Sequence, residues 1–238
     1  MSTPAVPEGA MSDTPAGGAA PYTFDDLPVE PIPAGSTVLV AGKQSTAAEE
    51  LAVALVASAA AAAQPEGALF VSTDTGAETL LTACGRLQPT FSPEIASVVD
   101  CSGADRDDEE VATVAAPSDL GGITTRFAAL YESLFDRLDD GRVRAGVVGL
   151  SSLAMHVELR SLLRFTRTVA GRVDIAAGFG AFALDPTAHH RQVGQTLGQA
   201  VDGRIEVREP PDASAADGEL RVRGFRDQPR EWTAFSLE

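Results

Sequence analysis

The chain has 238 residues, with 34 acidic against 18 basic side chains and a formal net charge of −16. This charge argues against a nucleic-acid-binding surface or docking on anionic lipid, because both depend on clustered lysine and arginine. Hydrophobic residues make up 44% of the chain, which is enough to bury a sizeable core.

The kinds of basic residue in the chain indicate the compartment and the type of organism in which the protein works. All but one of them are arginine, and Lys43 is the exception. An acidic, lysine-poor sequence is typical of a cytoplasmic protein from a salt-accumulating halophile, since molar salt reduces the Debye length to ~3 Å. The alternative is an ordinary acidic protein from a GC-rich genome. The longest apolar run, residues 51–63, is mostly alanine and is broken by Ser58, so we expect a buried helix and no membrane span.

The N-terminal residues differ from the rest of the chain. Residues 1–21 are mainly Pro, Gly, Ala, Ser and Thr, and this composition predicts a disordered tail. It also lacks the basic start and apolar core of a signal peptide. Residues 22–32 carry two aromatic side chains and are expected to dock on a single domain that covers residues 22–238.

The first element of that domain has the layout of a phosphate-binding loop. A buried strand is predicted over 37–41, Gly42 ends it, and a long alanine-rich helix is expected to begin at Thr46. Glu49, three residues after Thr46, suggests a capping box. A helix N-terminus after a glycine turn offers free N–H groups to an anion.

The residues inside this loop depart from the pattern G-x-x-x-x-G-K-[ST]. When the pattern starts at Gly42, its second glycine falls on Ala47, its lysine on Ala48 and its hydroxyl on Glu49. Lys43 is therefore either a displaced phosphate-binding lysine or a solvated turn residue.

Strands and helices alternate along the remaining chain. Further strands are predicted over 68–73, 96–101, 143–150 and 172–184, and three closing strands over 203–208, 219–225 and 232–236. Helices are predicted over 77–87, 119–138 and from Ser151–Ser152 to residue 169, and another after Pro186 with Asp185 as its cap. This alternation predicts an α/β fold with a mostly parallel sheet covered on both faces and an antiparallel C-terminal set.

The same order locates a candidate site. Ligands of open α/β sheets bind at the carboxyl ends of the strands, where the strand order reverses. The site residues expected there are Gly42, Lys43, Gln44, Ser45, Thr46, Asp74 and Ser151. Ser152 is expected at the same edge.

The chain resembles a RecA-like P-loop ATPase domain of the KaiC type, and in particular a degenerate haloarchaeal version of it. The resemblance is carried by PAGSTVLVAG, ALFVSTDT, GVVGLSSLAMHVELRSLLRF and the closing segments GRIEVRE, ELRVRGF and EWTAF. It implies the three-layer RecA-like P-loop NTPase fold, with Asp74 where a catalytic glutamate usually stands. The family's magnesium aspartate falls on Val148 or, shifted by one, on Gly149, and neither is a carboxylate.

These departures favour a non-catalytic RecA-like domain that acts as a regulatory or protein-interaction module, with no cofactor and no metal. The alternative is a weak or atypical ATP-binding protein with Mg²⁺, and a DNA-associated accessory role is disfavoured by charge. The partner is expected to be an unknown protein or a second copy. Arg160, Arg164 and Arg167 line one helix stripe, which is either a partner face or a solvated face.

Overall fold

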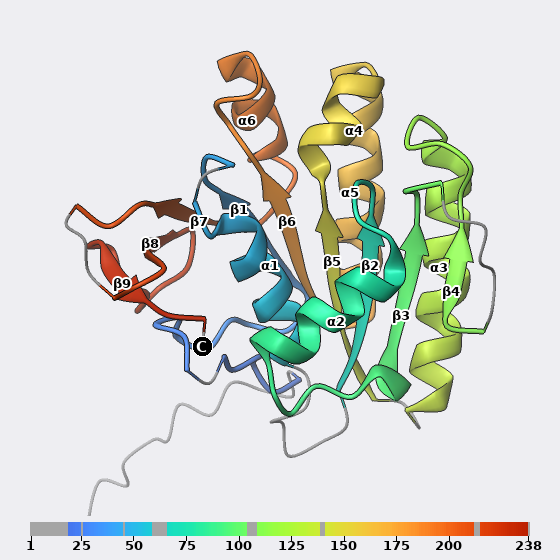
Figure 1. The fold of residues 1–238 in the computed structure, drawn as a ribbon, viewed down its shortest axis with the longest axis horizontal. Helices are drawn as coiled ribbons and strands as arrows, with labels where there is room; N and C mark the ends of the chain where they lie inside the picture. Colours follow the sequence, from blue (N-terminus) through green and yellow to red (C-terminus); the bar gives the residue numbers. More distant parts are fainter. Residues whose placement is uncertain are drawn as a thin grey trace, which may run out of the picture.

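The computed structural model describes residues 19–24, 26–44, 46–58, 66–103, 109–138, 141–211 and 215–237. The described residues form a nine-stranded sheet in the order β4-β3-β2-β5-β6-β1-β7-β8-β9 (Figure 1). The strands are β1 Ser36–Ala41, β2 Glu66–Ser72, β3 Ala96–Asp100, β4 Val111–Thr113, β5 Arg142–Val148, β6 Phe179–Leu184, β7 Gly203–Arg208, β8 Gly218–Arg223 and β9 Thr233–Phe235.

The first seven strands of that order pair in parallel, whereas β7–β8 and β8–β9 are antiparallel. The predicted α/β class, with a mostly parallel sheet and antiparallel C-terminal strands, is confirmed. The helices are α1 Ala48–Ala57, α2 Ala77–Leu87, η2 Pro93–Ile95 (a short 3₁₀ turn), α3 Leu120–Arg137, α4 Leu150–His156, α5 Leu159–Ile175 and α6 Arg191–Leu197.

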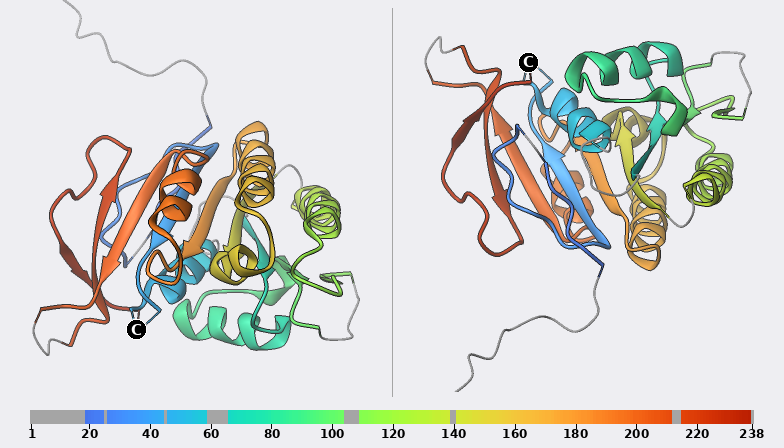
Figure 2. Two further views of the ribbon diagram at one scale, coloured as in Figure 1. Left: turned by 90° about the horizontal axis from the view of Figure 1, so that it is seen from above. Right: turned by 90° about the horizontal axis from the view of Figure 1, so that it is seen from below.

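Helices cover both faces of the sheet, and the sheet divides the hydrophobic core into two clusters. Helices α1 and α2 pack on one face, and α3, α4, α5 and α6 contribute to the cluster on the other face (Figure 2). Strand β1 lies between β6 and β7, and all six of its residues are buried. This explains its unbroken run of β-branched and aliphatic residues, since a central parallel strand faces apolar layers on both sides.

The segment before β1 is part of the core. Tyr22 forms an isolated antiparallel bridge with Ile32, and both side chains are completely buried. The rings of Tyr22 and Phe24 pack against Phe179 of β6, with centroids 5.8 and 4.9 Å apart. The predicted tail, up to residue 18, lies outside the described residues.

Several predicted boundaries are wrong. Strand β2 begins at Glu66 instead of Ala68, because Glu66 and Gly67 pair with Arg142 and Val143 of the adjacent strand β5. Strand β4 lies between the predicted strand over 96–101 and the predicted helix over 119–138, where no element was predicted.

The helix expected from residue 151 to 169 is two helices, and the second continues to Ile175. Residues 172–175 are therefore helical and do not belong to the strand predicted over 172–184. No helix begins at Pro186, since α6 starts at Arg191.

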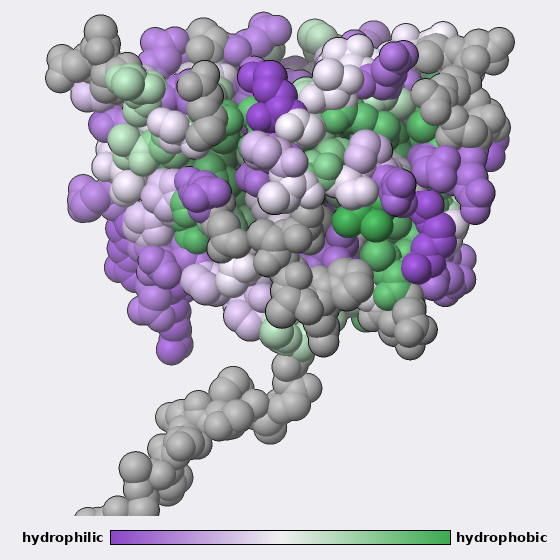
Figure 3. Space-filling model, turned by 60° about the horizontal axis from the view of Figure 1, so that its bottom comes forward, coloured by the Kyte–Doolittle hydropathy of each residue, from purple (hydrophilic) through white to green (hydrophobic). Residues whose placement is uncertain are grey.

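Charged and polar residues cover most of the face shown in Figure 3, and apolar residues show between them in separate patches. Cys84 and Cys101 are buried and free, and burial raises the pKa of each thiol to about 12. Within the described ranges, no helix is both long and apolar enough to cross a membrane.

Candidate functional site

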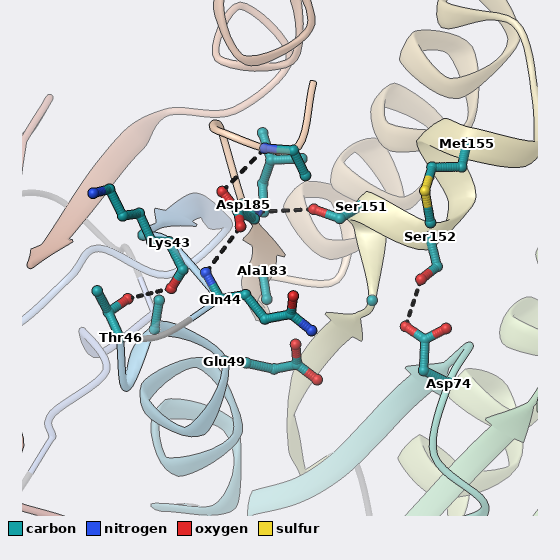
Figure 4. A pocket seen from close by; sticks show the side chains of 15 residues that line it. Lys43, Gln44, Thr46, Glu49, Asp74, Ser151, Ser152, Met155, Ala183 and Asp185 are labelled. Atoms are coloured by element: carbon teal, nitrogen blue, oxygen red, sulfur yellow. Dashed lines mark hydrogen bonds between the residues drawn. The ribbon is translucent and has the colours of Figure 1, made fainter. Parts of the chain in front are cut away.

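A cavity of about 220 Å³ opens at the carboxyl end of the sheet, where β1, β2, β5 and β6 run into their loops (Figure 4). Its lining residues are Gly42, Lys43, Gln44, Thr46, Ala48, Glu49, Asp74, Gly149, Ser151, Ser152, Met155, Ala183, Leu184, Asp185 and Ala188. This is the edge that strand order predicts for a ligand site.

The loop after β1 closes on itself. The Lys43 carbonyl accepts the Thr46 N–H at 2.8 Å and the Thr46 hydroxyl at 2.7 Å. A Cβ on Gly42 would lie only 2.4 Å from Thr46 Oγ1, so only glycine fits beneath this turn. The Thr46 hydroxyl therefore donates its hydrogen bond to the backbone of its own loop.

This hydrogen bonding corrects the predicted start of α1. The helix begins at Ala48, with Ala47 as its N-cap residue and no side-chain capping bond. The expected capping box between Thr46 and Glu49 does not form, because the Thr46 hydroxyl points back to Lys43. Glu49 and Glu50 lie in the first turn, where their negative charges complement the positive end of the helix dipole.

Asp185 connects the loop after β1, the loop after β6 and the start of α4 at the cavity. Its carboxylate accepts hydrogen bonds from the N–H groups of Gln44 at 2.9 Å, Thr187 at 2.7 Å and Ala188 at 3.3 Å. Its own N–H donates to the Ser151 hydroxyl at 2.8 Å. Desolvation acts to raise the pKa of Asp185, but the hydrogen bonds from Thr187, Gln44 and Ala188 outweigh it and lower the pKa. Asp185 caps a turn rather than the predicted helix.

Replacing Asp185 with asparagine is expected to destabilise the protein by about 1 kcal/mol at pH 7, because the charged acceptor of several N–H groups is lost. The pKa of Asp185 is lower in the folded than in the unfolded protein, so its stabilising effect is present above the unfolded pKa. It is lost as the pH falls through the folded pKa.

Urea denaturation of Asp185→Asn and wild type from pH 7 to pH 3 measures this difference, which should shrink on acidification. Asp174→Asn, an exposed aspartate whose carboxylate accepts no hydrogen bond among the described residues, should change the stability by less than about 0.5 kcal/mol. A difference independent of pH would contradict the charge-based explanation.

Asp74 lies on the opposite side of the cavity, and its carboxylate also accepts a hydrogen bond. The Ser152 hydroxyl donates to Asp74 Oδ2 at 2.7 Å, which connects the loop after β2 to the start of α4 (Figure 4). The Thr73 hydroxyl donates to the Gly149 carbonyl at 3.0 Å. Two hydrogen bonds therefore hold the ends of β2 and β5 together.

The electrostatic character of the cavity is acidic. Desolvation, followed by the negative charges of Asp74 and Glu50, raises the pKa of Glu49. Glu49, Asp74 and Asp185 all line the cavity. Lys43 also borders it, but its side chain points away from Glu49 and Asp74 (Figure 4).

The structure gathers six of the seven predicted site residues around this one cavity: Gly42, Lys43, Gln44, Thr46, Asp74 and Ser151. Ser45 lies outside the described residues. Ser152, expected at the same edge, also lines the cavity. Sequence reasoning missed Asp185 as a site residue. The position of Asp185 directly after β6, at the carboxyl end of a parallel strand, was the signal that could have revealed it.

No group of three or more His, Cys, Asp or Glu side chains in the described part of the chain is arranged to hold a metal ion. The three carboxylates of the cavity each face different loops, and two of them are hydrogen-bonded to neighbouring residues.

The architecture and the position of the cavity define a RecA-like α/β domain, and a known structure of this class superposes on it. A KaiC-like protein from the hyperthermophilic archaeon Pyrococcus horikoshii matches with a TM-score of 0.60 and 13% sequence identity, covering 92% of this chain and 94% of that one. This similarity shows the fold.

The chain belongs to DUF7504, a family of unknown function, whose model matches residues 35–207. The matched range begins just before β1 and ends within β7, so it contains every loop that lines the cavity. No curated protein sequence matches the chain.

Proposed function

We propose that the chain is a non-catalytic RecA-like domain that acts as a regulatory or protein-interaction module. The observation that carries this proposal is the acidic cavity at the N-terminus of α1, where a phosphate-binding loop would hold its anion. Glu49, Asp74 and Asp185 line that cavity, while the side chain of Lys43 points away from Glu49 and Asp74. Phosphoryl transfer depends on neutralising the charge of the transferred phosphate, and this arrangement opposes it.

The residues present do not fit Mg²⁺–ATP. The cavity of about 220 Å³ is smaller than the roughly 300–1,000 Å³ of usual small-molecule pockets. The Thr46 hydroxyl, which could have approached a magnesium ion, is bound to the Lys43 carbonyl. Val148, at the end of β5 where the resemblance puts the magnesium aspartate, is apolar and buried.

Calorimetric titration of the protein with ATP and with ADP, each with Mg²⁺ in high-potassium buffer, tests the proposal. We expect no heat of binding up to millimolar nucleotide and no ATP turnover. Micromolar binding, on the order of −8 kcal/mol, with turnover that disappears in Lys43→Ala, would contradict it. Arg230→Ala is the matched control, because it removes one positive charge from a residue that does not line the cavity.

A second candidate, a weak or atypical ATP-binding protein of the KaiC type, is favoured by one observation. Lys43 borders the cavity and is exposed, so a rotation of its side chain could bring the ammonium group toward a bound phosphate. The same titration separates the two functions. Binding that persists in Arg230→Ala but is lost in Lys43→Ala would favour this candidate.

A further inference from the structure

One helix face differs in charge from the rest of this acidic protein. Arg160, Arg164 and Arg167 follow one another at spacings of four and three residues along α5, and all three are exposed. Residues at these spacings lie on one side of a helix. Within the described ranges, none of the three guanidinium groups forms an ion pair or a hydrogen bond, whereas Arg137, Arg172 and Arg208 each pair with a glutamate.

The arginines border two adjoining hollows. The helices that line these hollows, α3 and α5, pack against each other on one face of the sheet (Figure 2). The first hollow, about 490 Å³, is lined by all three arginines together with Leu163 and Thr168. The second, about 390 Å³, lies against the start of α3 and shares Arg164 and Thr168 with the first. The two hollows therefore make one groove, which we call the arginine groove.

The lining of the arginine groove combines positive charge with apolar surface. Leu120, Leu163 and Phe165 supply apolar side chains, and the arginines supply guanidinium groups. No described Asp or Glu lines either hollow, although the chain carries 34 acidic residues against 18 basic ones. Positive charge is therefore separated from negative charge at this site, which is the arrangement that attracts an acidic ligand.

We infer that the arginine groove docks an acidic segment of another protein, one that carries carboxylates alternating with apolar side chains at helical spacing. Guanidinium groups bind carboxylates through paired N–H donors, and the apolar floor would contact the side chains between them. This inference rests on the proposed interaction function and names the surface and the chemistry of the partner.

The dimensions of the groove favour a short protein segment over a nucleic acid. The three arginines span eight residues of helix, a rise of about 10 Å, which is close to one Debye length at physiological salt. A longer polyanion would extend past them onto a chain whose net charge is −16. The same charge opposes the approach of a second copy.

The test uses a fluorescein-labelled, 16-residue helical peptide with glutamate and leucine at matching spacings, and an identical peptide with glutamine in place of glutamate. Fluorescence anisotropy measures binding to the full chain, to R160Q/R164Q/R167Q and to R191Q/R226Q/R230Q. The second variant is the matched control, since its three exposed arginines lie outside both hollows and have no ion-pair partner among the described residues. Circular dichroism confirms that each variant is folded in the salt used.

We expect the glutamate peptide to bind the wild type and the control variant with equal affinity. Its affinity for R160Q/R164Q/R167Q should fall about tenfold, as the loss of three exposed ion pairs predicts. Equal binding to the two triple variants, equal binding of the glutamine peptide, or no binding to the wild type would overturn the inference. So would arginine-dependent binding of a dT oligonucleotide alone, or arginine-dependent self-association in sedimentation.

The outcome is separable from that of the nucleotide titration. If nucleotide binds and the binding of the peptide still depends on the three arginines, only the non-catalytic assignment fails. If neither nucleotide nor peptide binds, the arginine groove is rejected and the non-catalytic assignment stands.

Discussion

Replacing Arg144 with methionine is expected to destabilise the protein by about 3–5 kcal/mol, because it leaves the Glu66 carboxylate buried without its main partner. Arg144 is 1% exposed and Glu66 is 2% exposed, at the amino ends of the adjacent strands β5 and β2. Arg144 Nε and Nη2 each lie 2.7 Å from Glu66 Oε2. Nη1 also donates to the Leu55 carbonyl at 3.1 Å, and Nη2 donates to the Thr23 carbonyl at 3.0 Å.

Urea denaturation at pH 7 measures this effect. The double variant Arg144→Met/Glu66→Gln should recover part of the lost stability, since it removes both charges from the interior. Recovery should be incomplete, because Arg142 Nη1 lies 3.4 Å from Glu66 Oε1 and also loses its partner.

Arg172→Met is the matched control. Arg172 pairs with Glu132 on the surface, and the loss of an exposed ion pair is expected to change stability by less than about 1 kcal/mol. Similar losses in Arg144→Met and Arg172→Met would contradict the importance assigned to the buried pair.

Gly149→Ala is expected to destabilise the protein by about 2–4 kcal/mol, because the backbone at Gly149 has φ +86° and the space beside it is filled. A Cβ at this position would lie 2.0 Å from Thr73 Oγ1 and 2.7 Å from Asp74 Oδ2. The substitution would push apart the ends of β2 and β5, where the candidate site lies.

Thermal and urea denaturation measure the loss. In the double variant Gly149→Ala/Thr73→Ala the overlap with Thr73 Oγ1 is relieved, but the close approach to Asp74 Oδ2 and the positive φ remain, so stability should recover only in part. Gly171→Ala is the control, since a Cβ there meets no atom within 4 Å and the residue lies inside α5. It should stabilise the helix by roughly 0.5–1 kcal/mol. Equal effects of the two single substitutions would reject the steric argument.

The sequence by itself determined the fold class and much of the candidate site. Runs of aliphatic residues indicate buried strands, and the periodicity of apolar residues indicates helices. Helix α2 was therefore predicted with both boundaries, at Ala77 and Leu87. Because parallel strands end at one edge, chain order alone placed Lys43, Asp74 and Ser151 together, and the structure gathers them around one cavity. What that cavity binds stays a prediction.

Contacts between distant segments were decided only by the tertiary structure. Glu66 and Arg144 are 78 residues apart. Glu66 precedes the strand predicted over 68–73 and Arg144 lies in the strand predicted over 143–150, and only the pairing of β2 with β5 brings them together. Asp185 likewise looked like a local helix cap, but β6 pairs with β1 and brings its carboxylate to Gln44. Periodicity and turn residues report on neighbours along the chain, whereas strand order, which sets these partners, depends on how the hydrophobic layers pack.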